Sequence, residues 1–465
     1  MHCPTPRSPA RAGMAPAFLV DLMLAVSLAA CGGGGGGTVV DNGTPVAAGP
    51  PASAQGPAPA PAGSSTPAPA PAPTPAQSPS ASPPAPTAAP APAPAPVPAP
   101  SPAPAAGSIA PAFSLLVLDP TGGTGSAHIN ASGQVAFSTA PQRQVQGMVF
   151  DGVKLLQVPG STTSAVTGIS ASGLAIGNLV DANGDSRAFV WDTGTQAVTL
   201  VDTPPGTSSS ATNINSRGQV CGTRTDRTVP SAFRWTPGMP SETLDSLGGA
   251  ASASAIETAL FINASAVVAG NSTTPSGSVH AALWAPGAPV QDLGTMGGIN
   301  SSVTGLNDAN QVIGQAEFPA GVLRAFRWTQ SDGMQPLGTL GGNLSFASGI
   351  NASGWIAGSS TDGAGNQLAF LWRDGAMKSL GTLGGPSSSA TAINTAGQVA
   401  GNASTAGGVG HAFVWSAADG MVDLNSRLHA SSPPELKSVL AIADNGAMVV
   451  QSSGGLVLLR PEPAP

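Results

Sequence analysis

Apolar and polar positions in the second half of the chain follow a pattern that returns every 43 to 49 residues. The two clearest copies are residues 350–358 and 393–401. In each copy an apolar run leads to an Asn, a turn ends in Gly three residues later, and a second apolar run follows. Asn and Gly accept the backbone angles of a tight turn, so each copy predicts a β-hairpin.

Eight copies of this hairpin can be aligned on one anchor position. The anchors are Asn130, Ser170, Asn215, Asn263, Asn307, Asn351, Asn394 and Ala443. A second marker lies 20 or 21 residues after each of the first seven anchors: Phe150, Trp191, Trp235, Trp284, Trp328, Trp372 and Trp415. Six of the seven Trp residues of the chain occupy this marker, so the repeat is longer than the hairpin alone.

The remainder of each unit predicts two more strands. In the copy that begins near Ile393, residues 411–415 form an apolar run, Asp419-Gly420 turns the chain, and residues 421–424 run apolar again. No unit holds a ten-residue segment with helical periodicity. Four short strands in about 44 residues are typical of one blade of a β-propeller.

The two ends of the repeat region predict how the ring closes. The last unit offers only three strands, and an unassigned apolar segment at residues 113–118 precedes the first unit. We therefore predict an all-β fold, a β-propeller of eight four-stranded blades in which the N-terminal strand completes the last blade. Seven blades, or a β-solenoid, are the alternatives.

The same residues resemble the HAF repeat family, bacterial extracellular repeats named for a His-Ala-Phe core. The triplet is intact at residues 411–413 and varied elsewhere, as in Arg324-Ala325-Phe326. The accompanying Leu-Gly-Thr-Leu-Gly-Gly element stands at residues 337–342 and 380–385. The resemblance implies a repeat fold outside the cytoplasm and no known activity.

The N-terminal part divides into two further segments. Residues 1–30 contain two Arg, an apolar stretch and small residues, as a signal peptide does, and residues 28–31 resemble the bacterial lipobox with Cys31 as the acylated residue. Residues 31–112 are rich in Gly, Pro and Ala and predict a disordered or polyproline spacer. The propeller is predicted over residues 113–460. Acylation of Cys31 would anchor the protein by lipid in the cell envelope. Gly32 stands where some bacteria use Asp as an inner-membrane retention signal, so we expect the anchor to lie in the outer membrane.

Composition narrows the classes of function. Charged residues make up 8% of the chain, the net charge is −7 and Tyr is absent. Nucleic-acid binding requires clustered Lys and Arg, and no such cluster occurs. No acid pair and no Ser-His-Asp set recurs among the repeats, so we predict that the chain is not an enzyme, and we assign it no cofactor.

Candidate functional residues lie in the loops between the second and third strands of the blades, which vary most. The charged candidates on this predicted binding face are Arg143, Arg224, Asp226, Arg227, Glu317 and Asp362. Asp181, Asn183 and Asp185 alternate around a Gly turn, which makes them a weak calcium candidate, although the same residues are ordinary in turns. Trp355 replaces a Gln of the repeat and predicts either a contact platform or local packing.

These features lead to a monomeric binding or scaffold protein, anchored to the membrane through Cys31, whose partner is an unknown protein or glycan. One alternative is a lipoprotein propeller that acts like an outer-membrane assembly factor. A second is a lyase or glycosidase built on a propeller.

Overall fold

The computed structural model describes residues 109–462, except for residues 111, 122–125, 141–143, 162, 205, 227–228, 250–254 and 429–431. Cys31, the predicted signal peptide and nearly all of the predicted spacer therefore lie outside the described residues, as do Arg143 and Arg227. All the regular elements described are β-strands, apart from the short 3-10 helices η3 (Pro319–Gly321) and η4 (Leu424–Arg427).

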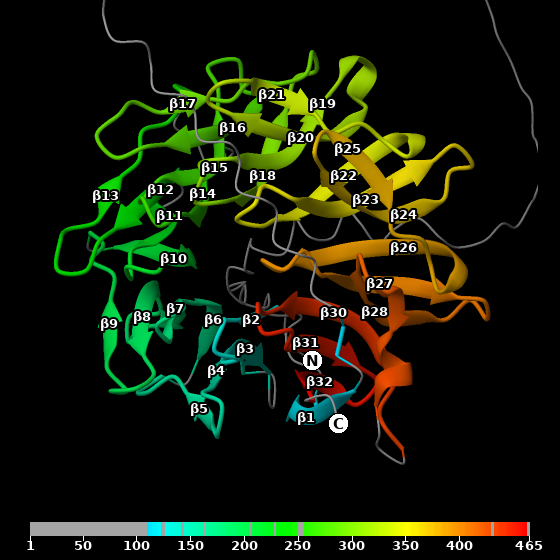
Figure 1. Ribbon diagram of the computed structural model, residues 1–465. Coiled ribbons are helices and arrows are strands. Elements are labelled where there is room, and N and C mark those ends of the chain that lie inside the picture. The colour runs from blue at the N-terminus through cyan, green and yellow to red at the C-terminus, as the bar shows by residue number, and fades with distance from the viewer. Residues whose placement is uncertain are drawn as a thin grey trace, which may run out of the picture. The chain divides into compact units, whose positions relative to one another are not determined.

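The strands form eight antiparallel sheets of four strands, arranged as the blades of an eight-bladed β-propeller (Figure 1). Blade 1 comprises β2 (Ala127–Ile129), β3 (Val135–Thr139), β4 (Gln146–Phe150) and β5 (Leu155–Gln157). Blade 2 comprises β6 (Ser164–Ile169), β7 (Leu174–Val180), β8 (Ser186–Asp192) and β9 (Val198–Leu200). Blade 3 comprises β10 (Thr207–Ile214), β11 (Val220–Asp226), β12 (Val229–Trp235) and β13 (Glu242–Thr243). Blade 4 comprises β14 (Glu257–Ile262), β15 (Val268–Thr273), β16 (Val279–Trp284) and β17 (Gln291–Asp292).

The remaining blades follow the same order. Blade 5 comprises β18 (Ser301–Leu306), β19 (Val312–Glu317), β20 (Leu323–Thr329) and β21 (Gly333–Pro336). Blade 6 comprises β22 (Gly341–Ile350), β23 (Ile356–Asp362), β24 (Gln367–Arg373) and β25 (Ala376–Ser379). Blade 7 comprises β26 (Gly384–Ile393), β27 (Val399–Thr405), β28 (Gly410–Ser416) and β29 (Gly420–Asp423). Blade 8 comprises β30 (Leu436–Ile442), β31 (Met448–Ser452), β32 (Gly455–Pro461) and β1 (Phe113–Asp119).

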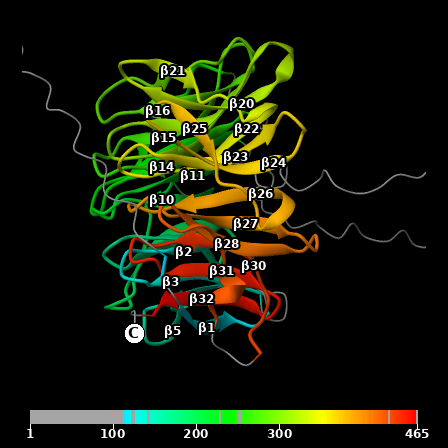
Figure 2. The same cartoon turned by 45° about the vertical axis from the view of Figure 1, so that its right-hand side comes forward.

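The closure of the ring confirms the predicted blade count. β1 pairs antiparallel with β32 from Phe113 opposite Pro461 to Asp119 opposite Leu456, and the two strands lie side by side in both views (Figure 2). The N-terminal strand therefore supplies the outermost strand of the C-terminal blade. Seven blades and a β-solenoid are both excluded.

The repeated triplet on the third strand is buried between neighbouring blades. Its middle Ala is at most 1% exposed in blades 2 to 7, and the Phe that follows in five of these blades is fully buried. The first position of the triplet is only partly buried in blades 2 to 7 and therefore tolerates His, Arg, Ser or Leu. The triplet is thus a packing element, with burial at its second and third positions.

Polar side chains join the blades through backbone groups. The anchor Asn donates from Nδ2 to the carbonyl oxygen of the next anchor, over 2.8–3.2 Å, in six of the eight junctions. Ser170 and Ala443 cannot make this bond, so it is missing after blades 2 and 8. Oδ1 of the same Asn accepts backbone N–H groups of its own turn, as Asn307 does from Ala309 and Gln311. One residue type therefore shapes the hairpin and links it to its neighbour.

Candidate functional site

Two sets of segments share one face of the ring, which we call the loop face. They are the loops between second and third strands and the connections that carry Gly-Gly from one blade to the next. The Gly249 N–H donates to Thr273 O, and the Gly298 N–H to Glu317 O, each over 3.0 Å. Each connection therefore lies against the loop of the blade that it enters.

The loops have a common turn geometry but different side chains. The Asp181 Oδ1 atom accepts the N–H groups of Asn183 at 2.8 Å and Asp185 at 3.0 Å. Asp362 does the same for Ala364 at 2.9 Å and Asn366 at 2.8 Å. A carboxylate at the first loop position thus forms the turn in blade 2 and in blade 6 alike.

The turn at Asp181 contains the residues that the sequence suggested as a calcium site. Asp181 uses one oxygen for the turn, as Asp362 does in a loop without the alternating pattern. Within the described ranges, no group of three His, Cys, Asp or Glu side chains is placed to hold a metal ion. The candidate of Asp181, Asn183 and Asp185 remains a prediction from sequence.

The described charged candidates differ in what they contact. Arg224 lies across its own blade and donates to Ser241 Oγ over 3.2 Å and to Thr243 Oγ1. Glu317 accepts from the Asn300 side chain over 3.0 Å, and this bond holds the pKa of Glu317 below its ordinary value. Arg224 thus joins the second and fourth strands of blade 3, and Glu317 joins the second strand of blade 5 to the connection that enters this blade. Asp226 ends β11, and Asp362 ends β23 beside a shallow open pocket of about 360 Å³.

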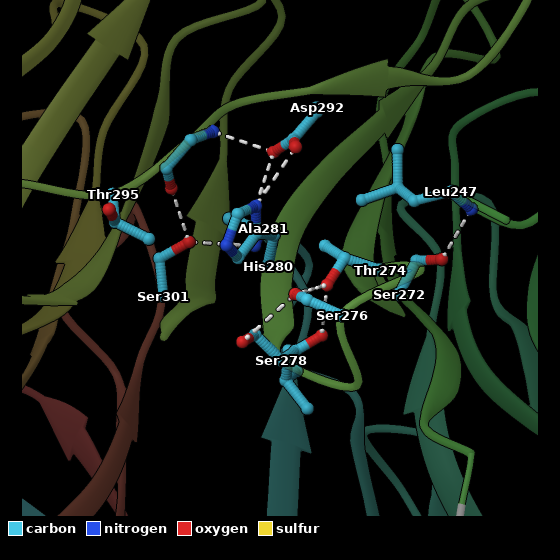
Figure 3. Close-up of polar contacts among 12 residues, drawn as sticks. Leu247, Ser272, Thr274, Ser276, Ser278, His280, Ala281, Asp292, Thr295 and Ser301 are labelled. Atoms are coloured by element: carbon cyan, nitrogen blue, oxygen red, sulfur yellow. Dashed lines mark hydrogen bonds and ion pairs between the residues drawn. The ribbon is translucent and has the colours of Figure 1, made fainter. Parts of the chain in front are cut away.

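The two described His residues of the repeated triplet are each paired with an Asp on the fourth strand of their blade. His280 Nδ1 lies 2.9 Å from Asp292 (Figure 3), and His411 Nδ1 lies 2.7 Å from Asp423 Oδ2. Both Asp residues follow their His by twelve positions, and this shared spacing is the sequence signal from which the pairs could have been predicted. These His residues belong to separate blades and do not converge on one site.

A buried carboxyl group replaces a hydroxyl at one blade junction. In blade 5, Ser301 accepts from the Ala281 N–H over 2.9 Å and donates to Gly294 O over 2.6 Å, which links two blades (Figure 3). Ser164, Ser209, Ser345 and Ser388 hold the same position in four other blades. Blade 4 has Glu257 instead, 7% exposed, and burial raises its pKa above the ordinary value.

Two residues that depart from the repeat belong to the core. Trp355 is 5% exposed, and its ring packs against Gly397 of the next blade, so the packing interpretation is right and a contact platform is excluded. Cys221 is fully buried, and burial raises the pKa of its thiol to about 12. None of the described helices is long and apolar enough to cross a membrane.

Comparisons with known proteins identify no family for the chain. No family model and no curated protein matches it. Among solved structures, dipeptidyl peptidase 4 of Porphyromonas gingivalis matches with a TM-score of 0.48 and 10% identity, over 70% of this chain and 56% of that one. TolB of Acinetobacter baumannii matches with a TM-score of 0.35 and 13% identity, over 53% of this chain and 63% of that one. A streptogramin B lyase matches with a TM-score of 0.37 and 9% identity, over 77% and 100%.

The chain thus spans less than two thirds of the TolB and peptidase chains that it matches. At this level of identity the comparisons concern the fold alone, and they assign no substrate or partner to this chain.

Proposed function

We propose that this protein is a lipid-anchored binding or scaffold propeller of the bacterial cell envelope, which holds a protein or glycan on its loop face and catalyses no reaction. The observation that carries the proposal is the contrast between a repeated framework and varied loops. Six junctions share the same Asn bond, whereas the first loop residue is Asp181, Thr274, Phe318, Asp362 or Thr405 in five of the blades. Varied loops on a rigid scaffold are the usual location of binding residues.

The absence of catalysis is supported by the use that the described polar groups already have. His280 and His411 hold outer strands together, Arg224 and Glu317 brace the loops, and Glu257 stands in a blade junction. General acid–base catalysis needs titratable groups that converge on one substrate. In the described part of the chain these groups lie in blades 3, 4, 5 and 7, so they do not share one site. His411 has two carboxylates beside it, Asp423 at 2.7 Å and Glu435 at 3.6 Å, and the other groups named lie in other blades.

Site-directed photo-crosslinking in intact cells tests the binding face. A photoreactive residue is placed at Ala182, Asp226 or Ala364 on the loop face, and control positions are Thr195, Ser331 and Ala418 in turns between third and fourth strands. We expect one shared adduct from the loop-face positions and none from the controls. Equal crosslinking from both sets, or adducts from the controls only, contradicts the proposal.

The anchor is tested independently through Cys31. Cys31→Ser removes the thiol that acylation requires, so the variant should lose palmitate labelling and leave the membrane fraction. The matched control is Cys221→Ser, which changes a buried thiol of the propeller and should retain both. A Cys31→Ser protein that stays labelled and membrane-bound excludes the lipoprotein assignment.

A further inference from the structure

One repeat position on the loop face differs in blade 6. At four blade entries the first Gly of the Gly-Gly pair has a positive φ and faces the second residue of the next loop. The facing pairs are Gly248 with Pro275, Gly297 with Pro319, Gly341 with Gly363, and Gly384 with Ala406. A side chain occupies the facing position in three blades, and blade 6 has none.

The missing side chain coincides with the pocket beside Asp362, which we call the blade 6 pocket. It lies between the start of β22, at residues 341–344, and the end of β23 with the loop that follows, at residues 361–365, and its volume is about 360 Å³. A Cβ on Gly363 would meet nothing closer than Gly341 O at 4.0 Å, and Gly363 does not have a positive φ. The space is therefore open because of a residue choice and not because of backbone strain.

The walls of the pocket carry a small and distinctive set of groups. The Asp362 carboxylate accepts from the N–H groups of Ala364 and Asn366 and from Asn366 Nδ2, and these bonds lower its pKa. The Asn343 side chain makes no hydrogen bond within the described residues. Leu344 is 37% exposed and adds an apolar surface, and its N–H is fixed by Thr361 Oγ1 over 3.0 Å.

These groups discriminate between classes of ligand. Among the described residues that line the pocket, Asp362 is the only ionisable one, so a ligand carboxylate or phosphate would meet a like charge and no cation in the lining. The nearby Arg324 guanidinium lies outside the lining and is engaged by Asn343 O over 3.3 Å. A lone ammonium group would gain only about 0–1 kcal/mol from one solvent-exposed carboxylate. A neutral ligand with several hydroxyls can instead donate to Asp362, exchange bonds with the Asn343 amide and the bare glycine backbone, and lay its C–H face on Leu344.

We propose that the blade 6 pocket binds a neutral sugar residue of a glycan. The proposal rests on the proposed function, because it names the class of partner for part of the loop face. Asp362 and Asn343 would hold the hydroxyls, and the Gly341 and Gly363 pair would let the sugar ring approach the backbone.

The test uses the full-length acylated protein in detergent micelles on an array of immobilised oligosaccharides. The array carries neutral glycans, ending in hexose or N-acetylhexosamine, and acidic glycans, ending in sialic or uronic acid. We expect binding to one or more neutral glycans and none to the acidic ones. The affinity for the best neutral glycan is then measured for Gly363→Leu, which fills the pocket, and Asp362→Asn, which removes its charge.

Each of these two variants should bind at least tenfold more weakly, with an unchanged melting temperature. The matched control is Ala406→Leu, which adds the same bulk at the equivalent position of blade 7 and should bind as the wild type does. If Gly363→Leu is unstable, Gly363→Ala takes its place with the same expected direction.

Failure of this proposal can be told from failure of the proposed function. Binding only to acidic glycans, binding to none, or equal losses in Gly363→Leu and Ala406→Leu each overturn the sugar site. The loop face as a whole is judged by the crosslinking experiment, which does not depend on the glycan array.

Discussion

Single residues of the repeat are determined by close contacts between strands. The first strands of blades 2 to 8 each contain a bulge shortly before the anchor, as between Val303 and Gly305. The bulge brings a carbonyl oxygen against the second strand, where a Cβ on Gly314 would overlap Ser302 O and the Phe326 ring. Glycine is therefore required there for steric reasons, without any unusual φ.

Gly314→Ala should lower the free energy of unfolding by about 3 kcal/mol, because the added methyl forces the bulge and Phe326 apart. Chemical denaturation followed by Trp fluorescence measures the change. The control is Gly407→Ala, since a Cβ on Gly407 meets only Thr405 Oγ1, at 3.8 Å. Equal free energies of unfolding for the two variants would show that the bulge does not require glycine at position 314.

Two carboxyl groups with opposite pKa shifts should respond oppositely to pH. Burial raises the pKa of Glu257, so its ionised form opposes folding and stability falls as pH rises through the raised value. Glu257→Gln should therefore stabilise the protein at pH 7 and lose this advantage on acidification to below pH 4.5.

Glu317 is the matched counterpart, because its hydrogen bond with Asn300 lowers its pKa. Its ionised form adds stability at neutral pH, and that contribution is lost as pH falls through the lowered value. Glu317→Gln should destabilise the protein at pH 7 and become neutral in acid. Thermal melts of both variants between pH 3 and pH 8 check the two signs, and shifts of the same sign would contradict these assignments.

At the scale of the strand and the blade, neutral polar side chains form links between units that recur around the ring, and a few charged side chains such as Arg234 add to them. The Asn bonds join the turns between first and second strands in adjacent blades. The bond from the Ala281 N–H to Ser301 Oγ joins the third strand of one blade to the first strand of the next blade. Thr304 adds a third link, from Oγ1 to Ala347 O over 2.9 Å. A chain with few charges can hold its blades together in this way, because each side chain satisfies a buried backbone group.

Asn307→Ala removes one such link and leaves Asn351 O without its side-chain partner. Asn351 O keeps its bond from the Gly354 N–H, but the Ala309 and Gln311 N–H groups lose Asn307 Oδ1 as their acceptor. A buried polar group left without a partner costs about 1–3 kcal/mol, so the free energy of unfolding should fall by about that amount. Urea titration measures the loss. The control is Asn343→Ala, whose exposed side chain bonds to no described residue and whose stability should match the wild type.

The closure of the ring belongs to the whole molecule. β1 covers β32, and Leu456, Val457, Leu458 and Leu459 of β32 are at most 2% exposed. The Ile109 N–H also donates to Asp419 Oδ2 over 2.7 Å, which ties the start of the propeller to blade 7. The strand β1, which follows the predicted spacer in the sequence, is thus part of the last blade.

Removal of residues 1–120 should therefore expose the β32 edge, lower the melting temperature by more than 10 °C and promote aggregation. Removal of residues 1–107 keeps β1 and is the control, with an unchanged melting temperature. Scanning calorimetry with light scattering compares the two proteins. An unchanged melting temperature without β1 would mean that pairing of β1 with β32 contributes little to the stability of the propeller.

The sequence alone predicted eight blades, the strand order and the closing strand, because turn residues and buried aromatic positions depend on local geometry and recur with the repeat. The alternatives of seven blades and a β-solenoid were excluded only by the eight sheets and the pairing of β1 with β32. It also identified the varied loops, and Cys31 remains a prediction from sequence alone. Tertiary structure decided the rest, because the deciding contacts join residues about 20 to 50 positions apart. Examples are the Asn links, the burial of Trp355 under Gly397, and the pocket between Gly341 and Gly363, where the absence of one side chain matters only once β22 and the loop after β23 meet within blade 6.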